Sequence, residues 1–259
     1  MKPLDPVIVG AGPAGSAAAI ALARTGYEVA LIDKQIFPRE KLCGDFVNPI
    51  NRAIFRDLRV EEQVLPQPHG TVTRFRITAS SGRAAEVAFA DGERGTEPGL
   101  GLRRACLDQV LVQRAAALGA AIYQGQRIDK FGRAAGGWRL TTAGGETWQA
   151  KMVIGADGRN SWVARQLGLD RRAVPAGRAV GFQSRLRFSA ATNDKIEIHL
   201  FPGGYAGVVA LGDGTINLGM AIDKRRLGGN HGSEFLFDHV LARNPHLKAI
   251  LGRRVGPAE

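Results

Sequence analysis

The chain has 259 residues, of which 44% are hydrophobic and 23% charged, a composition typical of a globular protein with one large or two modest domains. Its richest apolar stretch, residues 16–23, is too short to span a bilayer, and residues 1–6 lack the layout of a secretory signal. Two cysteines, Cys43 and Cys106, are too few for a disulfide scaffold and lack metal-ligand spacing. We therefore expect a cytoplasmic protein.

The chain is basic, with 35 Lys and Arg against 24 Asp and Glu, which favours anionic partners such as nucleotides, acidic lipid head groups or nucleic acid. The arginines are scattered along the chain rather than gathered into one stripe with interleaved aromatic residues. We therefore expect a solvated basic surface with a phosphate-binding pocket and a small-molecule substrate, and no nucleic-acid partner. Association with a membrane surface and the oligomeric state stay open.

The first 33 residues predict a strand, a glycine turn, a helix and a second strand. Residues 6–10 (PVIVG) are a short β-branched run, residues 11–25 have helix-forming composition that ends at Gly26, and residues 27–33 (YEVALID) are again strand-like. This order within about thirty residues is the βαβ unit of a parallel sheet.

Two helices and a hairpin are predicted next. A helix opens at Asn48-Pro49, where Asn suits the cap and Pro the first helical position. Residues 71–79 and 83–89 flank Ser81-Gly82 and predict an antiparallel hairpin. Apolar residues at helical spacing predict a second helix over 103–118.

The rest of the chain is rich in predicted strands. Short strands broken by glycine-rich turns cover residues 120–156, and a short helix follows at 160–168. Beyond a basic linker with a crossover near residue 175, longer antiparallel strands are expected at 179–188, 195–201, 205–211 and 215–222, followed by a helix at 233–243. The plan is a nucleotide-binding α/β domain interleaved with an antiparallel sheet domain.

A G-x-G-x-x-G motif spans residues 10–15 and includes Gly10, Gly12, Ala14 and Gly15. Such glycines permit a tight turn, close approach of a pyrophosphate and close helix-strand packing, and the following helix N-terminus faces the phosphates. Asp33, next to Lys34 at the end of the second strand, is placed to accept hydrogen bonds from a ribose. Because an acid there disfavours a 2′-phosphate, NAD and FAD remain as occupants; the alternative is a glycine turn without a ligand.

Residues 154–165 carry a second motif. Gly155, Ala156, Asp157 and Gly158, followed by Ser161 and Arg165, resemble the G-A-D-G-x-x-S-x-V-R motif of FAD-dependent aromatic hydroxylases, although the Arg stands one place late. The resemblance implies that Asp157 and Gly158 lie near the ribose and pyrophosphate of FAD. The alternative is an ordinary strand-to-helix turn with Asp157 as a helix cap.

Two further segments resemble the geranylgeranyl reductase branch of the same superfamily. Residues 39–45 (REKLCGD) resemble its R-x-K-x-C-G signature, which implies that Lys41, Cys43 and Gly44 run beside the cofactor. Residues 101–108 (GLRRACLD) place Arg104 where that branch has a cofactor-binding arginine. Further along the chain, Ile128 is expected to offer backbone hydrogen bonds to the adenine of the cofactor. The alternatives are a small buried thiol at Cys43, a solvated charge at Lys41 and a surface arginine at Arg104.

The resemblance implies a Rossmann-like FAD-binding domain over residues 1–69 and 101–175, interleaved with an antiparallel β-sheet substrate domain over 70–100 and 176–259. It implies an FAD-dependent oxidoreductase that takes hydride from NAD(P)H and reduces or hydroxylates an apolar or aromatic small molecule. The alternatives are an FAD monooxygenase, a catalytically inactive nucleotide-binding remnant and an NAD-only dehydrogenase. No catalytic acid or base is assigned, and the five histidines are expected to be structural or on the surface.

The family's further G-D-A-A-G-x-x-x-P stretch has no match in this sequence. We therefore expect a truncated family member that lacks one wall of the FAD site, with weak or absent retention of flavin by this chain alone.

Overall fold

A computed structural model describes residues 5–89, 97–169, 179–187, 194–227, 236 and 241–252. The chain divides into two compact units, the first made of residues 1–40, 55–64 and 104–173 and the second of residues 41–54, 65–103 and 174–259. These bounds differ from the predicted domains chiefly at residues 41–54, which join the second unit because the short strand β3 (Phe46–Val47) pairs with β7 (Gly99–Leu102). The assignment of the units to cofactor and substrate stays a prediction.

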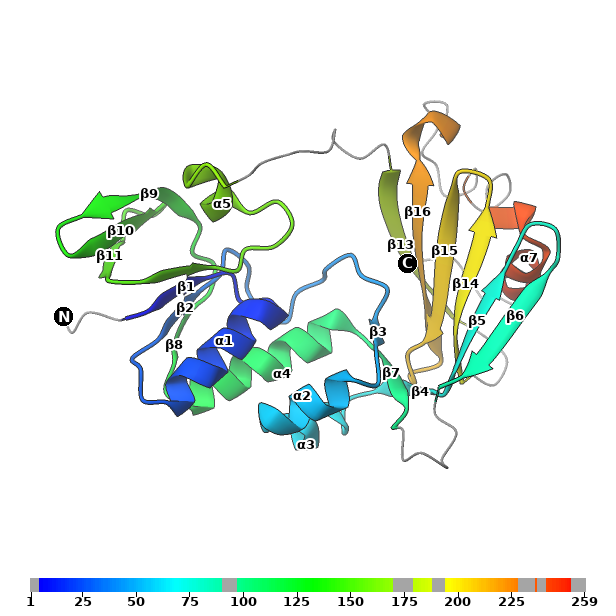
Figure 1. Cartoon of the computed structure of the whole chain (residues 1–259), viewed down its shortest axis with the longest axis horizontal. Helices are drawn as coiled ribbons and strands as arrows, with labels where there is room; N and C mark the ends of the chain where they lie inside the picture. The colour runs from blue at the N-terminus through cyan, green and yellow to red at the C-terminus, as the bar shows by residue number, and fades with distance from the viewer. Residues whose placement is uncertain are drawn as a thin grey trace. The chain divides into compact units, whose positions relative to one another are not determined.

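The first unit is built on a four-stranded parallel sheet in the order β12-β1-β2-β8. Helices α1 and α4 lie along one face of this sheet (Figure 1) and contact each other. The predicted βαβ unit is confirmed: the β1 residues are fully or almost fully buried, and the helix is followed by Gly26 with φ of 87°. The elements are β1 (Val7–Val9), α1 (Pro13–Arg24), β2 (Ala30–Ile32), α4 (Arg104–Ala117), β8 (Ala121–Tyr123) and β12 (Val153–Gly155).

A three-stranded antiparallel sheet, in the order β11-β10-β9, completes the first unit. It buries Ile128, Leu140 and Ala150 against Val7 and Val9 of β1, so that the two sheets share one apolar core. The remaining elements here are α3 (Glu61–Val64), β9 (Ile128–Ala134), β10 (Gly137–Thr142), β11 (Thr147–Ala150) and α5 (Trp162–Gln166), while α2 (Asn51–Asp57) crosses the boundary between the units. Helix α2 begins slightly later than predicted, and Asn48 accepts a hydrogen bond from the Ile50 amide at 3.1 Å.

The second unit is built on a six-stranded sheet in the order β13-β16-β15-β14-β5-β6, in which only β14 and β5 pair in parallel. The predicted hairpin and the four longer antiparallel strands are therefore confirmed. A smaller sheet, β3-β7-β4, crosses β15, where a Cβ on Gly101 would lie 1.8 Å from the Ala210 carbonyl oxygen. The strands are β4 (His69–Val72), β5 (Arg74–Thr78), β6 (Ala84–Ala88), β13 (Ala179–Arg187), β14 (Lys195–Phe201), β15 (Gly204–Ala210) and β16 (Thr215–Asp223).

One face of the large sheet is covered by helix α7 (Pro245–Leu251), which packs Leu247 and Leu251 onto the main apolar core of this unit. The sequence did not predict α7. The predicted helix over 233–243 falls mostly outside the described residues, which hold only Leu236 and the short helix η3 (Leu241–Arg243) of that range. Another short helix, η1 (Lys224–Arg226), follows β16. Within the described residues no helix is long and apolar enough to cross a membrane.

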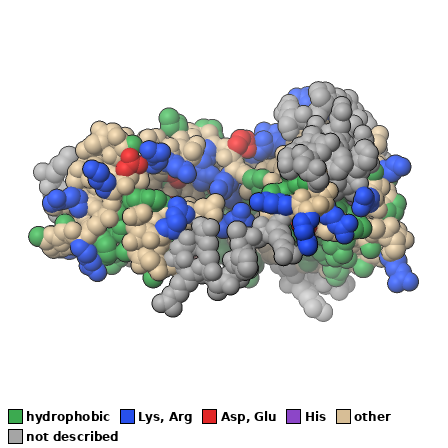
Figure 2. Space-filling view, turned by 90° about the horizontal axis from the view of Figure 1, so that it is seen from above, with side chains coloured by type: hydrophobic (Ala, Val, Ile, Leu, Met, Phe, Trp, Pro, Cys, Tyr) green, Lys and Arg blue, Asp and Glu red, His purple; other side chains and the backbone are tan. Residues whose placement is uncertain are grey.

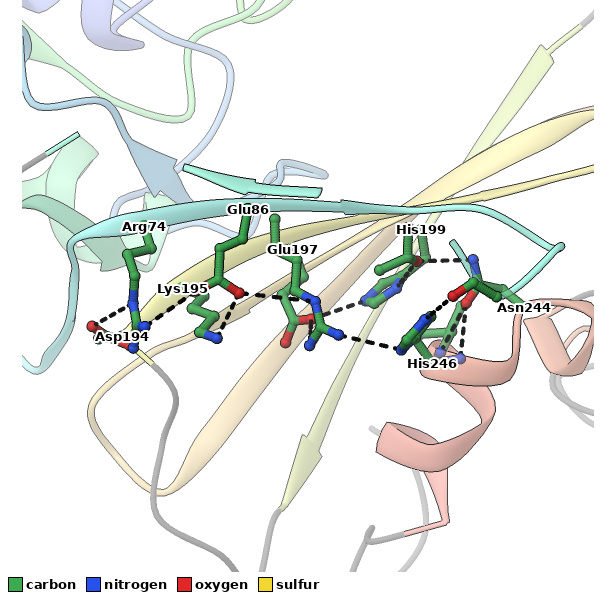
Figure 3. A network of polar contacts seen from close by, with 12 residues as sticks. Arg74, Glu86, Asp194, Lys195, Glu197, His199, Asn244 and His246 are labelled. Carbon is green, nitrogen blue, oxygen red and sulfur yellow. Dashed lines mark hydrogen bonds and ion pairs between the residues drawn. The ribbon is translucent and has the colours of Figure 1, made fainter. Parts of the chain in front are cut away.

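Charged side chains on the same face form a row along β5, β6 and β14 that ends beneath α7 (Figure 3). Arg76 lies at its centre and contacts Glu86 at 4.0 Å, Glu197 at 3.5 Å and the Nδ1 atom of His246 at 3.3 Å. Glu197 is almost fully buried, so its ion pair with Arg76 offsets part of the cost of removing its charge from water.

The row ends at His199, whose ring is fully buried. The amide of Asn244 is oriented by its Oδ1 atom, which accepts from the backbone amides of His246 and Leu247, so its Nδ2 donates to the Thr78 hydroxyl at 2.9 Å. That hydroxyl also forms a hydrogen bond with Nδ1 of His199 at 2.8 Å. His199 therefore lies in the core of the second unit, and its structural role stays a prediction.

Acid is expected to destabilise the protein through His199. Burial, together with the positive charges of His246 and Arg76, lowers the pKa of His199 from 6.5 to about 4. Between these values the unfolded chain binds more protons than the folded one, so the free energy of unfolding falls as pH drops from 6.5 to 4, by about 3 kcal/mol from this group alone. Denaturant melts at several pH values should show a shallower slope for His199→Asn than for the wild type, and equal slopes would contradict this role of His199.

Candidate functional site

The glycine turn after β1 is packed against the segment that follows β12. Gly10 has φ of 104°, and a Cβ there would lie 2.5 Å from the Ala156 carbonyl oxygen. A Cβ on Gly15, in the first turn of α1, would lie 1.8 Å from the carbonyl oxygen of Gly10. The two motifs recognised in the sequence therefore meet in the first unit, and the first and third glycines are required because backbone occupies the space of a side chain.

The N-terminus of α1 has the features of an anion site. Gly12 caps the helix without any side-chain hydrogen bond, Pro13 stands at the first helical position, and the first turn, which includes Ala14, holds no acidic residue. The Nη2 atom of Arg39 lies 3.4 Å from the position that a Cβ on Gly12 would take, and apart from the adjacent residues no other described atom lies within 4 Å of that position. A helix N-terminus beside a guanidinium group attracts negative charge.

Asp33 holds the end of β2 against this turn. Its Oδ2 atom accepts a hydrogen bond from the Ala11 amide at 2.7 Å, and Oδ1 accepts one from the Gln35 amide at 2.8 Å. A carboxylate has further lone pairs, so contact with a ribose is compatible with this geometry. Lys34, next in the chain, is exposed.

Two arginines share one fully buried carboxylate beside α1. Arg104 donates to Asp108 through Nε at 3.0 Å and Nη2 at 2.9 Å, and Arg39 lies 3.4 Å from the same carboxylate. The Nε atom of Arg39 is buried and has no hydrogen-bond partner among the described residues. The sequence reading assigned Arg104 to the cofactor but not Arg39, although Arg39 begins the same R-x-K-x-C-G signature as Lys41 and Cys43.

The carboxylate of Asp157 lies at the N-terminus of helix α5, whose N-cap residue is Ser161. Its carboxylate accepts hydrogen bonds from the Ser161 hydroxyl and from the backbone amides of Trp162 and Val163, the last two at 2.6 and 3.2 Å. This is the geometry of the alternative that the sequence left open, a capped strand-to-helix turn. Gly158 follows with φ of 88°, and contact of either residue with a flavin stays a prediction. Ile128 is buried at the start of β9, and its contact with an adenine likewise stays a prediction.

Lys41, Cys43 and Gly44 belong to the second unit, where two amide side chains hold the loop 41–45 on the large sheet. The Cys43 amide donates to Oε1 of Gln183 at 3.0 Å, and the Cys43 carbonyl oxygen accepts from Nδ2 of Asn217 at 3.0 Å. The Nε2 atom of Gln183 donates to Asn217 at 2.8 Å and to the buried carboxylate of Asp45 at 3.1 Å. Neither Gln183 nor Asn217 was predicted as a site residue, because polar residues also occur elsewhere in the strands that hold them.

Removing the Gln183 amide is expected to expose the Cys43 thiol. In a Cys106→Ser background, Gln183→Leu should raise the rate of reaction of Cys43 with a disulfide reagent about tenfold or more, because losing hydrogen bonds to a backbone amide and a buried carboxylate costs about 1–3 kcal/mol. The same change at the exposed Gln149 serves as the control. An unchanged rate in Gln183→Leu would show that this amide does not hold the loop.

The residues of the first unit fit a dinucleotide. An uncapped helix N-terminus, a side-chain-free position at Gly12 and the unpartnered Nε of Arg39 together suit a diphosphate, and Asp33 stands at the end of the adjacent strand. Lys and Arg side chains far outnumber acidic ones on the face shown in Figure 2, which favours approach of an anion. The fold and this site define a dinucleotide-binding protein of the βαβ class.

Comparison with known proteins identifies the family within this class of dinucleotide-binding proteins. The model of the FAD binding domain family matches residues 4–200, and the chain belongs to that family. Its fold is similar to that of a flavoprotein/dehydrogenase from Cytophaga hutchinsonii, with a TM-score of 0.84 at 18% identity over 100% of this chain and 66% of that one. The sequence-based fold class, a Rossmann-like FAD-binding domain with an antiparallel sheet, is confirmed.

Two curated relatives carry names that describe reductases. Digeranylgeranylglycerophospholipid reductase 1 of Methanococcoides burtonii is 28% identical over 93% of this chain and 60% of its own length. Menaquinone reductase of Mycobacterium tuberculosis is 32% identical over 83% of this chain and 54% of its own length. The resemblance to the geranylgeranyl reductase branch is thus confirmed, while this chain spans little more than half of each relative.

Proposed function

We propose that this chain is the FAD-binding part of an oxidoreductase that uses NAD(P)H to reduce a double bond in an apolar, isoprenoid-bearing or aromatic small molecule. The observation that carries the proposal is the anion site at the N-terminus of α1, where Gly12, Arg39 and the neighbouring Asp33 suit the ADP half of FAD. The named activities of the two relatives support the reductase assignment.

Bound FAD would supply the redox chemistry, accepting hydride from NAD(P)H and passing it to the substrate. The protein's own part is to hold the diphosphate at α1, to bind the ribose through Asp33 and to keep Arg39 and Arg104 in place through Asp108. In the second unit, Gln183 and Asn217 fix the backbone of Cys43. Cys43 belongs to the loop 41–45, and the resemblance implies that this loop runs beside the cofactor.

Stopped-flow reduction of the FAD-loaded chain by NADH and by NADPH tests the proposal. Bleaching of the flavin absorbance by at least one of the two, with reoxidation by a double-bond substrate without oxygen, is the expected result. Reoxidation that consumes oxygen and yields a hydroxylated product would instead establish the monooxygenase alternative. A flavin that neither nucleotide reduces would favour the inactive remnant.

A further inference from the structure

Helix α7 covers one face of the large sheet and depends on its contacts with that sheet. It has seven residues, so its own hydrogen bonds are too few to keep it helical in water. Leu247 and Leu251 pack on the apolar core of the second unit. At the N-terminus of the helix, the Asn244 side chain donates to the Thr78 hydroxyl at 2.9 Å and to the Leu200 carbonyl oxygen at 3.0 Å. The position of α7 therefore follows from what attaches it to the sheet.

His246 provides a second polar attachment, between α7 and the hairpin of β5 and β6. Its Nδ1 atom lies 3.3 Å from Nη2 of Arg76, and its Nε2 atom lies 2.8 Å from the carbonyl oxygen of Gly82. A guanidinium group only donates and a carbonyl oxygen only accepts, so Nδ1 is the acceptor and Nε2 carries the ring proton. These two contacts therefore select the uncharged form of the ring.

A second proton on His246 is incompatible with this arrangement. It would sit on Nδ1, where it removes the hydrogen bond from Arg76 and places two cations against each other. The carboxylates of Glu197 and Glu86 already face the same guanidinium group, at 3.5 and 4.0 Å. Protonation of His246 therefore weakens the attachment of α7 to the hairpin.

The fully buried ring of His199 lies next to His246 at the end of the charged row (Figure 3). The Thr78 hydroxyl, which Asn244 of α7 contacts, also forms a hydrogen bond with Nδ1 of His199 at 2.8 Å. Burial, followed by the charges of His246 and Arg76, lowers the pKa of His199 to about 4, so this ring is uncharged at neutral pH. Closure of α7 thus keeps a proton from both histidines.

The charged row is balanced only while both rings are uncharged. Besides the histidines, it holds three cations and three carboxylates, which are Arg74, Arg76, Lys195, Glu86, Asp194 and Glu197. Two exposed cations are close in the chain, Arg83 next to Gly82 and Lys248 two residues after His246. A proton on either histidine therefore leaves an excess of positive charge between α7 and the sheet.

We propose that His199 and His246 form a pH-sensitive latch that holds α7 on the large sheet while both rings are uncharged and releases it when they take up protons. Release of α7 separates His246 from Arg76 and opens His199 to water, so the released state binds more protons than the closed state. The latch lies within the second unit and requires neither flavin nor substrate, so it stands or falls apart from the proposed function.

Acid therefore favours release of α7. The His199 ring titrates near 6.5 when released and at about 4 when closed, so the equilibrium constant for release rises about tenfold between pH 7.5 and 5.5. His246 adds to this rise because Arg76 opposes its second proton in the closed state. Hydrogen bonds from Lys195 and Arg74 lower the pKa values of Glu86 and Asp194, so these carboxylates stay ionised over this range.

Hydrogen exchange of residues 244–252, followed by mass spectrometry at pH 7.5 and 5.5 and corrected for the intrinsic effect of pH, tests the latch. In the wild type, protection of this segment should fall about thirtyfold or more between the two pH values, of which His199 supplies about tenfold. At pH 5.5 it should also stay well below the protection of β15 and β16, because α7 is released from a sheet that remains folded.

His246→Gln is the decisive variant. Glutamine can accept from Arg76 and donate to the Gly82 carbonyl oxygen, but it takes up no proton. Protection of residues 244–252 in this variant should fall only about tenfold, and addition of His199→Asn should remove the remaining response to pH. Lys248→Gln, the same replacement at an exposed cation of the same helix, should respond like the wild type.

Three results would overturn the latch. The first is wild-type protection of residues 244–252 that does not change between the two pH values. The second is a response in His246→Gln as large as that of the wild type, which needs no folded His199 variant for its interpretation. The third is equal protection of α7 and of β15 and β16 at both pH values, which would mean that the whole unit unfolds and that α7 is not released by itself.

Discussion

Gly15→Val is expected to abolish measurable FAD binding and to lower the free energy of unfolding by about 3 kcal/mol or more. A side chain at this position meets the Gly10 carbonyl oxygen, 1.8 Å from the ideal Cβ. The oxygen belongs to backbone and the backbone of residue 15 fixes the Cβ, so no side-chain rotation relieves the clash. Helix α1 must therefore shift away from β1, and its N-terminus leaves the place where Arg39 and Asp33 surround it. FAD titration followed by flavin fluorescence, with thermal melts of the same samples, measures both effects.

Gly132→Val is the matched control for this variant. Gly132 lies in β9 of the same unit, where a Cβ would meet no described atom within 4 Å, and valine suits a strand. This variant should retain both stability and FAD affinity. Equal FAD affinity in Gly15→Val and Gly132→Val would show that the glycine turn does not form the cofactor site.

Asp108→Ala is expected to be the most destabilising single change of a charged residue in the first unit. Its carboxylate is fully buried, and Arg39 and Arg104, both largely buried, depend on it for their charge balance. Removing one partner of a buried ion pair leaves uncompensated charge and costs about 3–5 kcal/mol. The two guanidinium groups also lose their fixed positions beside α1, so FAD affinity should fall together with stability.

Asp129→Ala provides the comparison for this loss. Asp129 pairs with Arg127 at 3.1 Å, but both side chains are exposed, so the change should cost no more than about 1 kcal/mol. Chemical denaturation of the two variants should separate them clearly. A loss in Asp108→Ala no larger than that in Asp129→Ala would contradict the role assigned to the buried carboxylate.

Local signals predicted most of the fold. The βαβ unit follows from a β-branched run, a glycine turn and an alanine-rich helix that lie next to one another in the chain, and all three act through neighbouring residues. The strands of the large sheet follow from alternation, in which Leu218 and Ile222 point to the core and Asn217 to the other face. Helix α7 was missed although Asn244-Pro245 repeats the cap signal used at Asn48-Pro49, because a helix over 233–243 was expected to end there.

The site was predicted less completely because its contacts join distant segments. The residues next to Arg39 in the chain do not indicate that its partner is Asp108. The Gln183 amide that holds Cys43 likewise comes from a strand far along the chain. Asp157 shows a second limit: an aspartate after a strand serves equally at a helix N-terminus or as a cofactor ligand, and only the geometry shows that it accepts from the first amides of α5. Residue type and spacing alone do not distinguish these roles.

Competition between FAD, ADP and riboflavin for this chain tests most directly whether the N-terminus of α1 holds the ADP half of FAD. The titration is done at equilibrium with added flavin, so that retention during purification does not affect it. FAD should bind and ADP should displace it, whereas riboflavin, which lacks the diphosphate and adenosine, should bind at least about a hundredfold more weakly. Riboflavin binding as tight as that of FAD, or FAD binding that ADP does not displace, would contradict the assignment of this site.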